Sequence, residues 1–303
     1  MDATRTTVEA PVGLPAAARQ VVADYVALTK PKVQSLLLFT TVTTMLVAGD
    51  PSLGLIALTC LGGYLSAGGA GAVNHWYDRD VDARMKRTAD RPVASGRVAP
   101  TAALVYAFSL QIASFVILTV GANLLSAFLA LTGFVWYTVI YTVWLKRRSP
   151  QNIVIGGAAG AVPPLVGWAA VTGSVAPTAL YLFAIIFYWT PPHFWALSLL
   201  MKNEYERVGV PMMPVVHGEK ETRRQIVLYT LLLTLLTLLP FVFGFFGVLY
   251  AVVAVGLNTA FITLSIRLQR NADRASALRV YLFSLSYLAV LFVAMVADAQ
   301  LLS

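Results

Sequence analysis

The chain has 303 residues, of which 58% are hydrophobic and 12% are charged, and one Cys, which excludes an intramolecular disulfide framework. With a mean hydropathy of +0.73, it is too apolar for one soluble core to bury its apolar side chains, so lipid is expected to cover part of them. In such a chain the formal charge of +8 indicates membrane orientation and attraction of phosphate, and it gives no support for nucleic-acid binding.

Residues 1–23 contain Asp2, Glu9 and two prolines but no apolar core, and they are predicted to be a disordered N-terminal tail. Residues 24–303 are predicted to form a single transmembrane domain. Within it, nine apolar runs approach the roughly 20 helical residues that cross a hydrocarbon layer of about 30 Å. They lie at Val33–Ala48, Leu53–Val73, Ala102–Val120, Asn123–Leu145, Ile153–Thr172, Thr178–Leu200, Gln225–Phe241, Gly247–Ile266 and Tyr281–Ala297.

These runs are predicted to be helices, because backbone polar groups cannot stay unpaired in lipid and no short alternating segments indicate a barrel. The expected fold is therefore all-α, a polytopic membrane bundle of about nine transmembrane helices. All 22 Lys and Arg precede the first run or follow an even-numbered one. Because cytoplasmic loops carry the basic excess, the N-terminus is expected in the cytoplasm and the C-terminus outside.

The loop after the second run begins with Asn74 and continues through Asp78 and Asp82. If the helix continues past Val73, these side chains are spaced i, i+4, i+8 and share one face. Amide and carboxylate oxygens without His or Cys partners favour Mg²⁺, which takes its remaining ligands from water and substrate phosphate. The alternative is a set of solvated Asp–Arg ion pairs, although these would not explain an Asn in phase with two acids at the mouth of a membrane helix.

Two later runs contain proline pairs, Pro163-Pro164 and Pro191-Pro192, which are expected to bend the helices and open internal space. His193 follows the second pair and is a candidate ligand or proton donor, although a lone intramembrane His is more often structural. Gly156 and Gly160 indicate close helix packing.

The loop after the sixth run carries a second group of polar residues, Lys202, Asn203, Glu204 and Tyr205. Glu204 could complete a metal site from the opposite half of the bundle. A solvated charged loop is an equally good interpretation of this segment.

These motifs resemble those of the UbiA-type intramembrane prenyltransferases, and more narrowly their heme-farnesylating branch. The resemblance covers roughly residues 24–298. Four strings carry it: LTKPKVQSLLLFTT, NHWYDRDVDARMKRTADRPVASGRV, YTVWLKRRSPQNIVIGGAAGAVPPLVGW and WTPPHFWALSLLMKNEYERVGVPMMPVV. The acidic motif marks the superfamily, whereas NIVIGG and PPHFW indicate the branch.

The resemblance implies transfer of farnesyl from farnesyl diphosphate to a vinyl group of heme b, with hydration, to give heme O for terminal oxidases. It implies a bacterial inner-membrane protein with its active site on the cytoplasmic side, and a downstream heme-modifying enzyme as a partner. Asn74, Asp78 and Asp82 would be the catalytic Mg²⁺ ligands, with Glu204 as a further ligand. The expected substrate-binding residues are Lys86, Arg87, Arg91, Lys30, Lys32, Lys146, Arg147, His193, Lys202 and Tyr205.

One departure from the superfamily pattern concerns the second loop, which lacks the second aspartate pair of other members. A second, fully acidic metal site is therefore not expected, and Glu204 is interpreted as its remnant. Two alternatives remain at this point: a sibling prenyltransferase acting on an aromatic or quinone precursor, and a transporter. The transporter is disfavoured because the acids cluster at the cytoplasmic mouth and not at the midplane.

Overall fold

The computed structural model describes residues 15–302, and this part of the chain contains helices and no strand. The long segments are α2 (Pro31–Ala48), α3 (Leu53–Tyr77), α5 (Pro100–Gly121), α6 (Leu124–Val135) continued by the π-helix η1 (Trp136–Leu145), α7 (Asn152–Thr172), α8 (Pro177–Leu200), α11 (Gly218–Val242), α12 (Val248–Asn271) and α13 (Arg274–Leu302). Four short helices are α1 (Ala16–Leu28), α4 (Arg79–Asp82), α9 (Lys202–Arg207) and α10 (Met213–Val216). The all-α prediction is confirmed.

Each predicted apolar run corresponds to one of the long segments. Among the described residues, eight are long and apolar enough to cross a membrane, with α6 and η1 counted together. The exception is α8, which carries Pro191, Pro192 and His193 in its interior. It packs against α7, α11 and α13, so protein covers much of its surface and its lower apolarity is tolerated.

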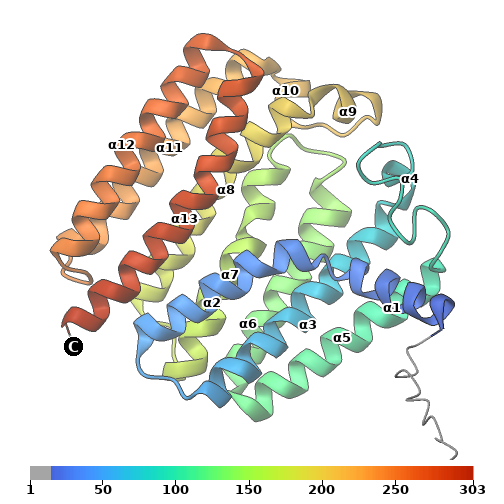
Figure 1. Cartoon of the computed structure of the whole chain (residues 1–303), viewed down its shortest axis with the longest axis horizontal. Coiled ribbons are helices and arrows are strands. Elements are labelled where there is room, and N and C mark those ends of the chain that lie inside the picture. Colours follow the sequence, from blue (N-terminus) through green and yellow to red (C-terminus); the bar gives the residue numbers. More distant parts are fainter. Residues whose placement is uncertain (1–14, 303) are drawn as a thin grey trace, which may run out of the picture.

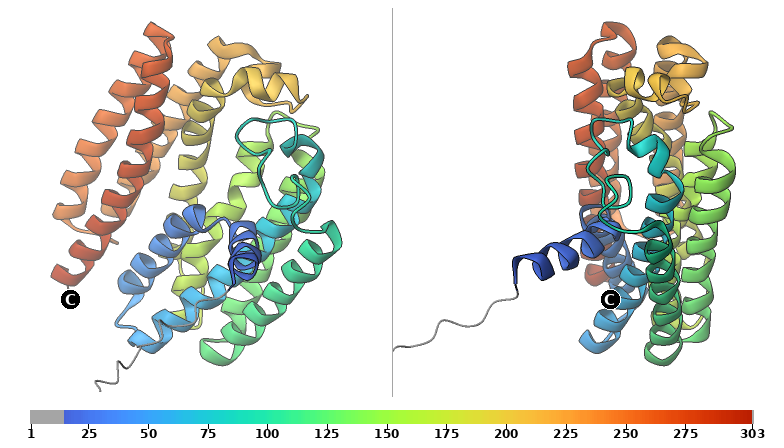
Figure 2. Two further views of the ribbon diagram at one scale, coloured as in Figure 1. Left: turned by 45° about the vertical axis from the view of Figure 1, so that its right-hand side comes forward. Right: turned by 90° about the vertical axis from the view of Figure 1, so that its right-hand side faces the viewer.

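The helices form one bundle in which α4, α9 and α10 lie at the same end (Figure 1). The C-terminal end of α13 lies at the opposite end of the bundle (Figure 1). A view from the side shows α1 projecting away from the bundle (Figure 2). In the centre, α2 packs against α3, α7 and α13 and so joins the earlier helices to the last one.

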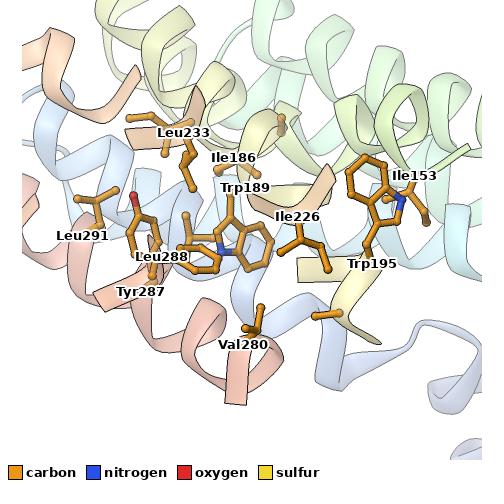
Figure 3. Packing of buried hydrophobic residues seen from close by; sticks show 14 of the residues in the cluster. Ile153, Ile186, Trp189, Trp195, Ile226, Leu233, Val280, Tyr287, Leu288 and Leu291 are labelled. Carbon is orange, nitrogen blue, oxygen red and sulfur yellow. The ribbon is translucent and has the colours of Figure 1, made fainter. Parts of the chain in front are cut away.

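The largest apolar cluster lies among α7, α8, α11, α12 and α13 (Figure 3). Trp195 and Tyr287 belong to it and are among the largest fully buried side chains. The outer surface is apolar as well: Val105, Ile112 and Val120 on α5 are exposed by 68%, 67% and 82%. An apolar core under an apolar exterior is what a bundle covered by lipid requires.

Helix ends differ from the predicted apolar runs wherever polar residues continue a helix. The helix α1 occupies residues 16–28, which corrects the predicted tail over residues 16–23; residues 1–14 lie outside the described part of the chain. Likewise α11 begins at Gly218 and α13 at Arg274, each about two turns before the predicted start. Hydropathy detects only the lipid-spanning portion of such helices.

Candidate functional site

The site is built around a column of polar side chains at the end of α3. The helical path continues through the α3–α4 junction, because Asp78 N donates to Asn74 O at 2.9 Å and Asp82 N donates to Asp78 O at 2.7 Å. Asn74, Asp78 and Asp82 therefore follow one another along one face, as their spacing predicts. Each is at most 3% exposed.

Three cations contact this column, two from distant segments and one from the same loop. Lys30 Nζ donates to Asn74 Oδ1 at 2.6 Å, and Arg91 Nη1 lies 2.7 Å from Asp82 Oδ2. Lys146 Nζ forms an ion pair with Asp78 Oδ2. Each member of the column thus has its own cation, and Asn74 Nδ2 also donates to Asp78 Oδ2 at 2.7 Å. Because the groups are buried, these contacts are stronger than ion pairs at a surface.

Lys30 reaches the column from an unusual backbone conformation at the start of α2. Its φ of 54° and ψ of 57° are left-handed, which costs a residue with a side chain about 1–2 kcal/mol. Burial lowers the pKa of its ammonium well below the usual value, and the charges of Arg91 and Lys146 lower it further. Asp78 and Asp82 act in the opposite direction with smaller effect. A cation held among other cations is a favourable contact for an anion such as diphosphate.

Two carboxylate oxygens, one in the column and one on α9, are buried without a hydrogen-bond partner among the described residues. The first is Asp78 Oδ1, which lies 3.6 Å from Arg147 Nη2, and the second is Glu204 Oε2. No group of three His, Cys, Asp or Glu side chains in the described residues could hold a metal alone. The oxygen donors present are too few to fill the coordination shell of a metal ion. Such a partial set suits Mg²⁺, because Mg²⁺ in proteins usually keeps water and phosphate among its ligands.

The π-helix η1 contacts the column and Lys30, and the sequence did not predict its π-type bonding. Thr142 Oγ1 accepts from Asn74 Nδ2 at 3.4 Å, and Tyr137 OH lies 3.4 Å from Lys30 Nζ. Its last turn ends with the π-type bond from Lys146 N to Tyr141 O at 2.9 Å. Isolated π-turns are frequent at functional sites. Here the π-helix brings the tyrosines, the threonine and Lys146 to one site.

Arg147 follows the end of η1 and connects it to the first loop through several contacts. It contacts both oxygens of Asp80 at 2.6 and 2.9 Å, donates to Tyr77 O at 2.8 Å and lies 4.6 Å from the centre of the Tyr77 ring. The hydrogen bond from Arg147 lowers the pKa of Asp80, and the same contact raises the pKa of Arg147. Arg147 is thus engaged with protein groups, while Lys146 next to it is directed at the column.

The second loop approaches the first one. Arg207 Nη2 donates to Arg84 O at 2.9 Å, which links α9 to the loop after α4. Tyr205 and Asp78 both lie within electrostatic range of the Tyr141 hydroxyl. Lys202, in contrast, pairs with Glu219 at 3.2 Å and is turned toward α11. Tyr205 of α9 is therefore near Tyr141 of η1, and among the described residues no hydrogen bond or ion pair joins α9 to the column.

The remaining predicted substrate-binding residues lie outside these contacts. Lys32, Lys86 and Arg87 are exposed and form no ion pair with the described residues. His193 is buried in the α8–α13 interface, where its Nδ1 lies 2.7 Å from Ser284 Oγ. One residue that the sequence left unassigned belongs near the column: His75 is 3% exposed, its two ring nitrogens have no hydrogen-bond partner, and Lys30, Arg91 and Lys146 lie within electrostatic range. In the sequence, only the position of His75 next to Asn74 indicated a place near the column.

Comparisons with known proteins agree with this architecture. A family model described as "UbiA prenyltransferase family" matches residues 37–289. A relative from Thermus thermophilus, named Protoheme IX farnesyltransferase, is 53% identical over 91% of this chain and 46% of its own length. One from Erythrobacter litoralis with the same name is 47% identical over 98% of this chain and 97% of its own length. The chain therefore spans about half the length of the first relative and nearly all of the second.

Solved structures with low identity share the fold. A digeranylgeranylglyceryl phosphate synthase structure superposes with a TM-score of 0.77 at 17% identity, covering 92% of this chain and 99% of that one. A UbiA homolog from Archaeoglobus fulgidus, bound to DMAPP and Mg²⁺, gives a TM-score of 0.63 at 15% identity, covering 89% and 99%. Together with the eight apolar helices, the match to the family model identifies an integral membrane protein.

Proposed function

The chain belongs to the UbiA prenyltransferase family, and on this basis we propose that it farnesylates heme b to give heme O. The relatives that are about half identical and named Protoheme IX farnesyltransferase support this acceptor. The single observation that carries the chemistry is the buried column of Asn74, Asp78 and Asp82 with one cation on each member. Such a site suits a diphosphate held at the end of an apolar bundle.

Mg²⁺ would be held by Asn74, Asp78 and Asp82, with Glu204 as a ligand from α9. The two unpartnered carboxylate oxygens, on Asp78 and Glu204, support this assignment. Bound there, the metal supplies Lewis-acid charge that neutralises the diphosphate.

In the proposed reaction, the bond between C1 of the farnesyl group and the diphosphate oxygen breaks, and the electron pair leaves with diphosphate. Lys30, Arg91 and Lys146 bind the oxygens on which this charge develops, with Arg87, Lys86 and Lys32 as more distant contributors. Tyr137 and Tyr141 lie beside the cations and limit access of water from this side. The terminal vinyl carbon of heme b forms the new carbon–carbon bond. The cation left on the inner vinyl carbon is captured by water with loss of a proton.

Heme b itself would be held by residues of the second half. His193 on α8 and the α9 residues Lys202 and Tyr205 are the proposed contacts, because they come from the part of the bundle that does not hold the column. A downstream heme-modifying enzyme would receive the product.

The site is proposed to face the cytoplasm in a bacterial inner membrane, with the N-terminus on the same side. The arrangement of Lys and Arg in alternate loops supports this orientation. A single cysteine introduced at exposed Lys86, in a Cys60→Ser background, would be labelled by a membrane-impermeant maleimide only after the cytoplasmic side of the membrane is opened. Labelling in intact cells would reverse the orientation.

Product analysis tests the function directly. The full chain in detergent or in membranes is given farnesyl diphosphate, heme b and MgCl₂, and a heme enlarged by one farnesyl group and one hydroxyl group is expected by mass spectrometry. A control receives a quinone precursor such as 4-hydroxybenzoate in place of heme b. Prenylation of that acceptor without any heme product would contradict the proposal.

A further inference from the structure

His193 is held by two short contacts that together fix the position of its proton. Its Nδ1 lies 2.7 Å from Ser284 Oγ, and Ser284 Oγ lies 2.6 Å from Tyr281 O. Each contact is so short that a hydrogen must lie between the two atoms. The serine hydroxyl has one hydrogen and a carbonyl has none, so the hydroxyl donates to Tyr281 O and Nδ1–H donates to the hydroxyl. The Nε2 atom of the neutral ring therefore carries a lone pair.

The packing around the ring leaves only this lone pair for a ligand. Trp189 stacks on the imidazole with centroids 4.4 Å apart and planes 17° apart, and Tyr281 stacks at 4.9 Å and 28°. A stacked ring can be approached only along its edge. Nδ1 is already used, and Nε2 forms no hydrogen bond with the described residues.

The hydrogen-bonded frame around His193 is rigid. Trp189 Nε1 donates to Ser284 O at 2.7 Å, so α8 contacts both the backbone and the side chain of Ser284. Trp189 itself lies in the centre of the largest core cluster (Figure 3). Phe194, whose ring packs edge-on against the imidazole at 5.3 Å, is 39% exposed. This exposed side chain packs directly against the imidazole, which is itself 7% exposed.

We infer that His193 Nε2 coordinates the iron of the heme acceptor and that Ser284 is the positioning residue that sets its tautomer; the inference rests on the proposed function. Iron requires a lone-pair donor along the ring edge, with the other nitrogen held by a hydrogen bond. A heme propionate requires a hydrogen-bond donor, which Nε2 in this tautomer does not provide. Of the three histidines, His217 is exposed and His75 lies near the diphosphate site, so His193 is the one placed for an apolar acceptor.

The test is titration of ferric heme into the full-length protein in detergent, read by absorption and electron paramagnetic resonance spectroscopy. Wild type and the exposed control His217→Ala are expected to show histidine-ligated heme. His193→Ala is expected to lose that signature and to recover it with added imidazole. Ser284→Ala, with the proton no longer fixed, is expected to bind heme about 10–100-fold more weakly.

Separate outcomes distinguish this inference from the proposed function. If wild type forms heme O and His193→Ala keeps an unchanged ligation spectrum, the ligation is contradicted and the function stands. If wild type shows histidine-ligated heme that depends on His193 but forms no farnesylated product, the function fails and the ligation stands. Thermal unfolding of each variant, followed by tryptophan fluorescence, shows whether His193→Ala is folded. If His193→Ala is not folded, His193→Gln, which keeps most of the side-chain volume, is used in its place.

Discussion

The two loops at the charged end of the bundle differ in how their acids are used. In the first, Asp78 and Asp82 are buried and each is paired with a cation. In the second, Glu204 has an unpartnered buried oxygen, while Lys202 is paired with Glu219 on another helix. This pairing fits the proposal that the first loop holds the diphosphate and the metal, with one further ligand from the second loop.

The difference follows from where each loop finds its cations. The first loop receives Lys30 and Lys146 from elements far along the chain, and both lie within the bundle end. The second loop contains α9, and none of the residues of α9 is buried. Buried groups in a low dielectric interact strongly, whereas exposed ones are screened by water and salt.

The largest effect is expected for Asp78→Asn. The change removes the central charge of the column and leaves Lys146 without its partner, so turnover should fall about 100- to 1000-fold. Heme O formation is measured by mass spectrometry, with wild type and Asp90→Asn as references, since Asp90 contacts only Arg97. Near-normal turnover of Asp78→Asn in a folded protein would remove the first loop from the chemistry.

A smaller effect is expected for Lys146→Met, which keeps the length of the side chain but removes its charge. Loss of a cation that contacts the column and is proposed to bind the diphosphate should lower turnover about 10- to 100-fold. The matched control is Arg148→Met, two residues further along the chain, which is exposed. Equal losses in the two variants would mean that the effect is one of general positive charge.

The helix behind η1 offers a test of geometry without a change of charge. A Cβ at Gly156 would lie 2.3 Å from Tyr141 Cδ2, whereas one at Gly160, a turn further along α7, meets nothing within 4 Å. Gly156→Ala should therefore displace Tyr141, destabilise the protein by about 1–3 kcal/mol and lower turnover. Gly160→Ala should be neutral or slightly stabilising. Thermal unfolding and turnover are compared for the pair, and equal behaviour would contradict the role assigned to η1.

The sequence predicts the column well because helical periodicity is local: the spacing of Asn74, Asp78 and Asp82 determines their common face once α3 continues. It is harder to predict which Lys and Arg side chains contact the column. Lys86 and Arg87 follow the column closely in sequence and were predicted to bind substrate, yet they are exposed, whereas Arg91, predicted with them, pairs with Asp82. Lys30 and Lys146, which contact the column, come from 44 and 68 residues away. Which distant segments meet is decided by helix packing, and one sequence does not reveal it.

Two other features could not be predicted from helical periodicity, each for a different reason. The apolar residues of η1 have the composition of an ordinary helix, so the π-type bonding that aims Lys146 at Asp78 leaves no compositional signal. Residues 16–23 of α1 were predicted to belong to a tail because they lack an apolar core, but the helix continues to Asp24, which pairs with Arg97 of the first loop at 3.0 Å. Tertiary contacts thus override local composition at both places.

The smallest change is expected for Glu204→Gln on α9, and it bears most directly on the asymmetry of the two loops. If Glu204 supplies one ligand to a metal otherwise held by the column, the loss of charge should lower Mg²⁺ affinity about 10-fold, and excess Mg²⁺ should restore turnover. The exposed neighbour Glu206→Gln provides the control for charge on the same helix. A loss as large as that of Asp78→Asn, and not restored by Mg²⁺, would mean that α9 carries an equal half of the site. No loss at all would leave its buried oxygen without a role and the first loop as the whole site.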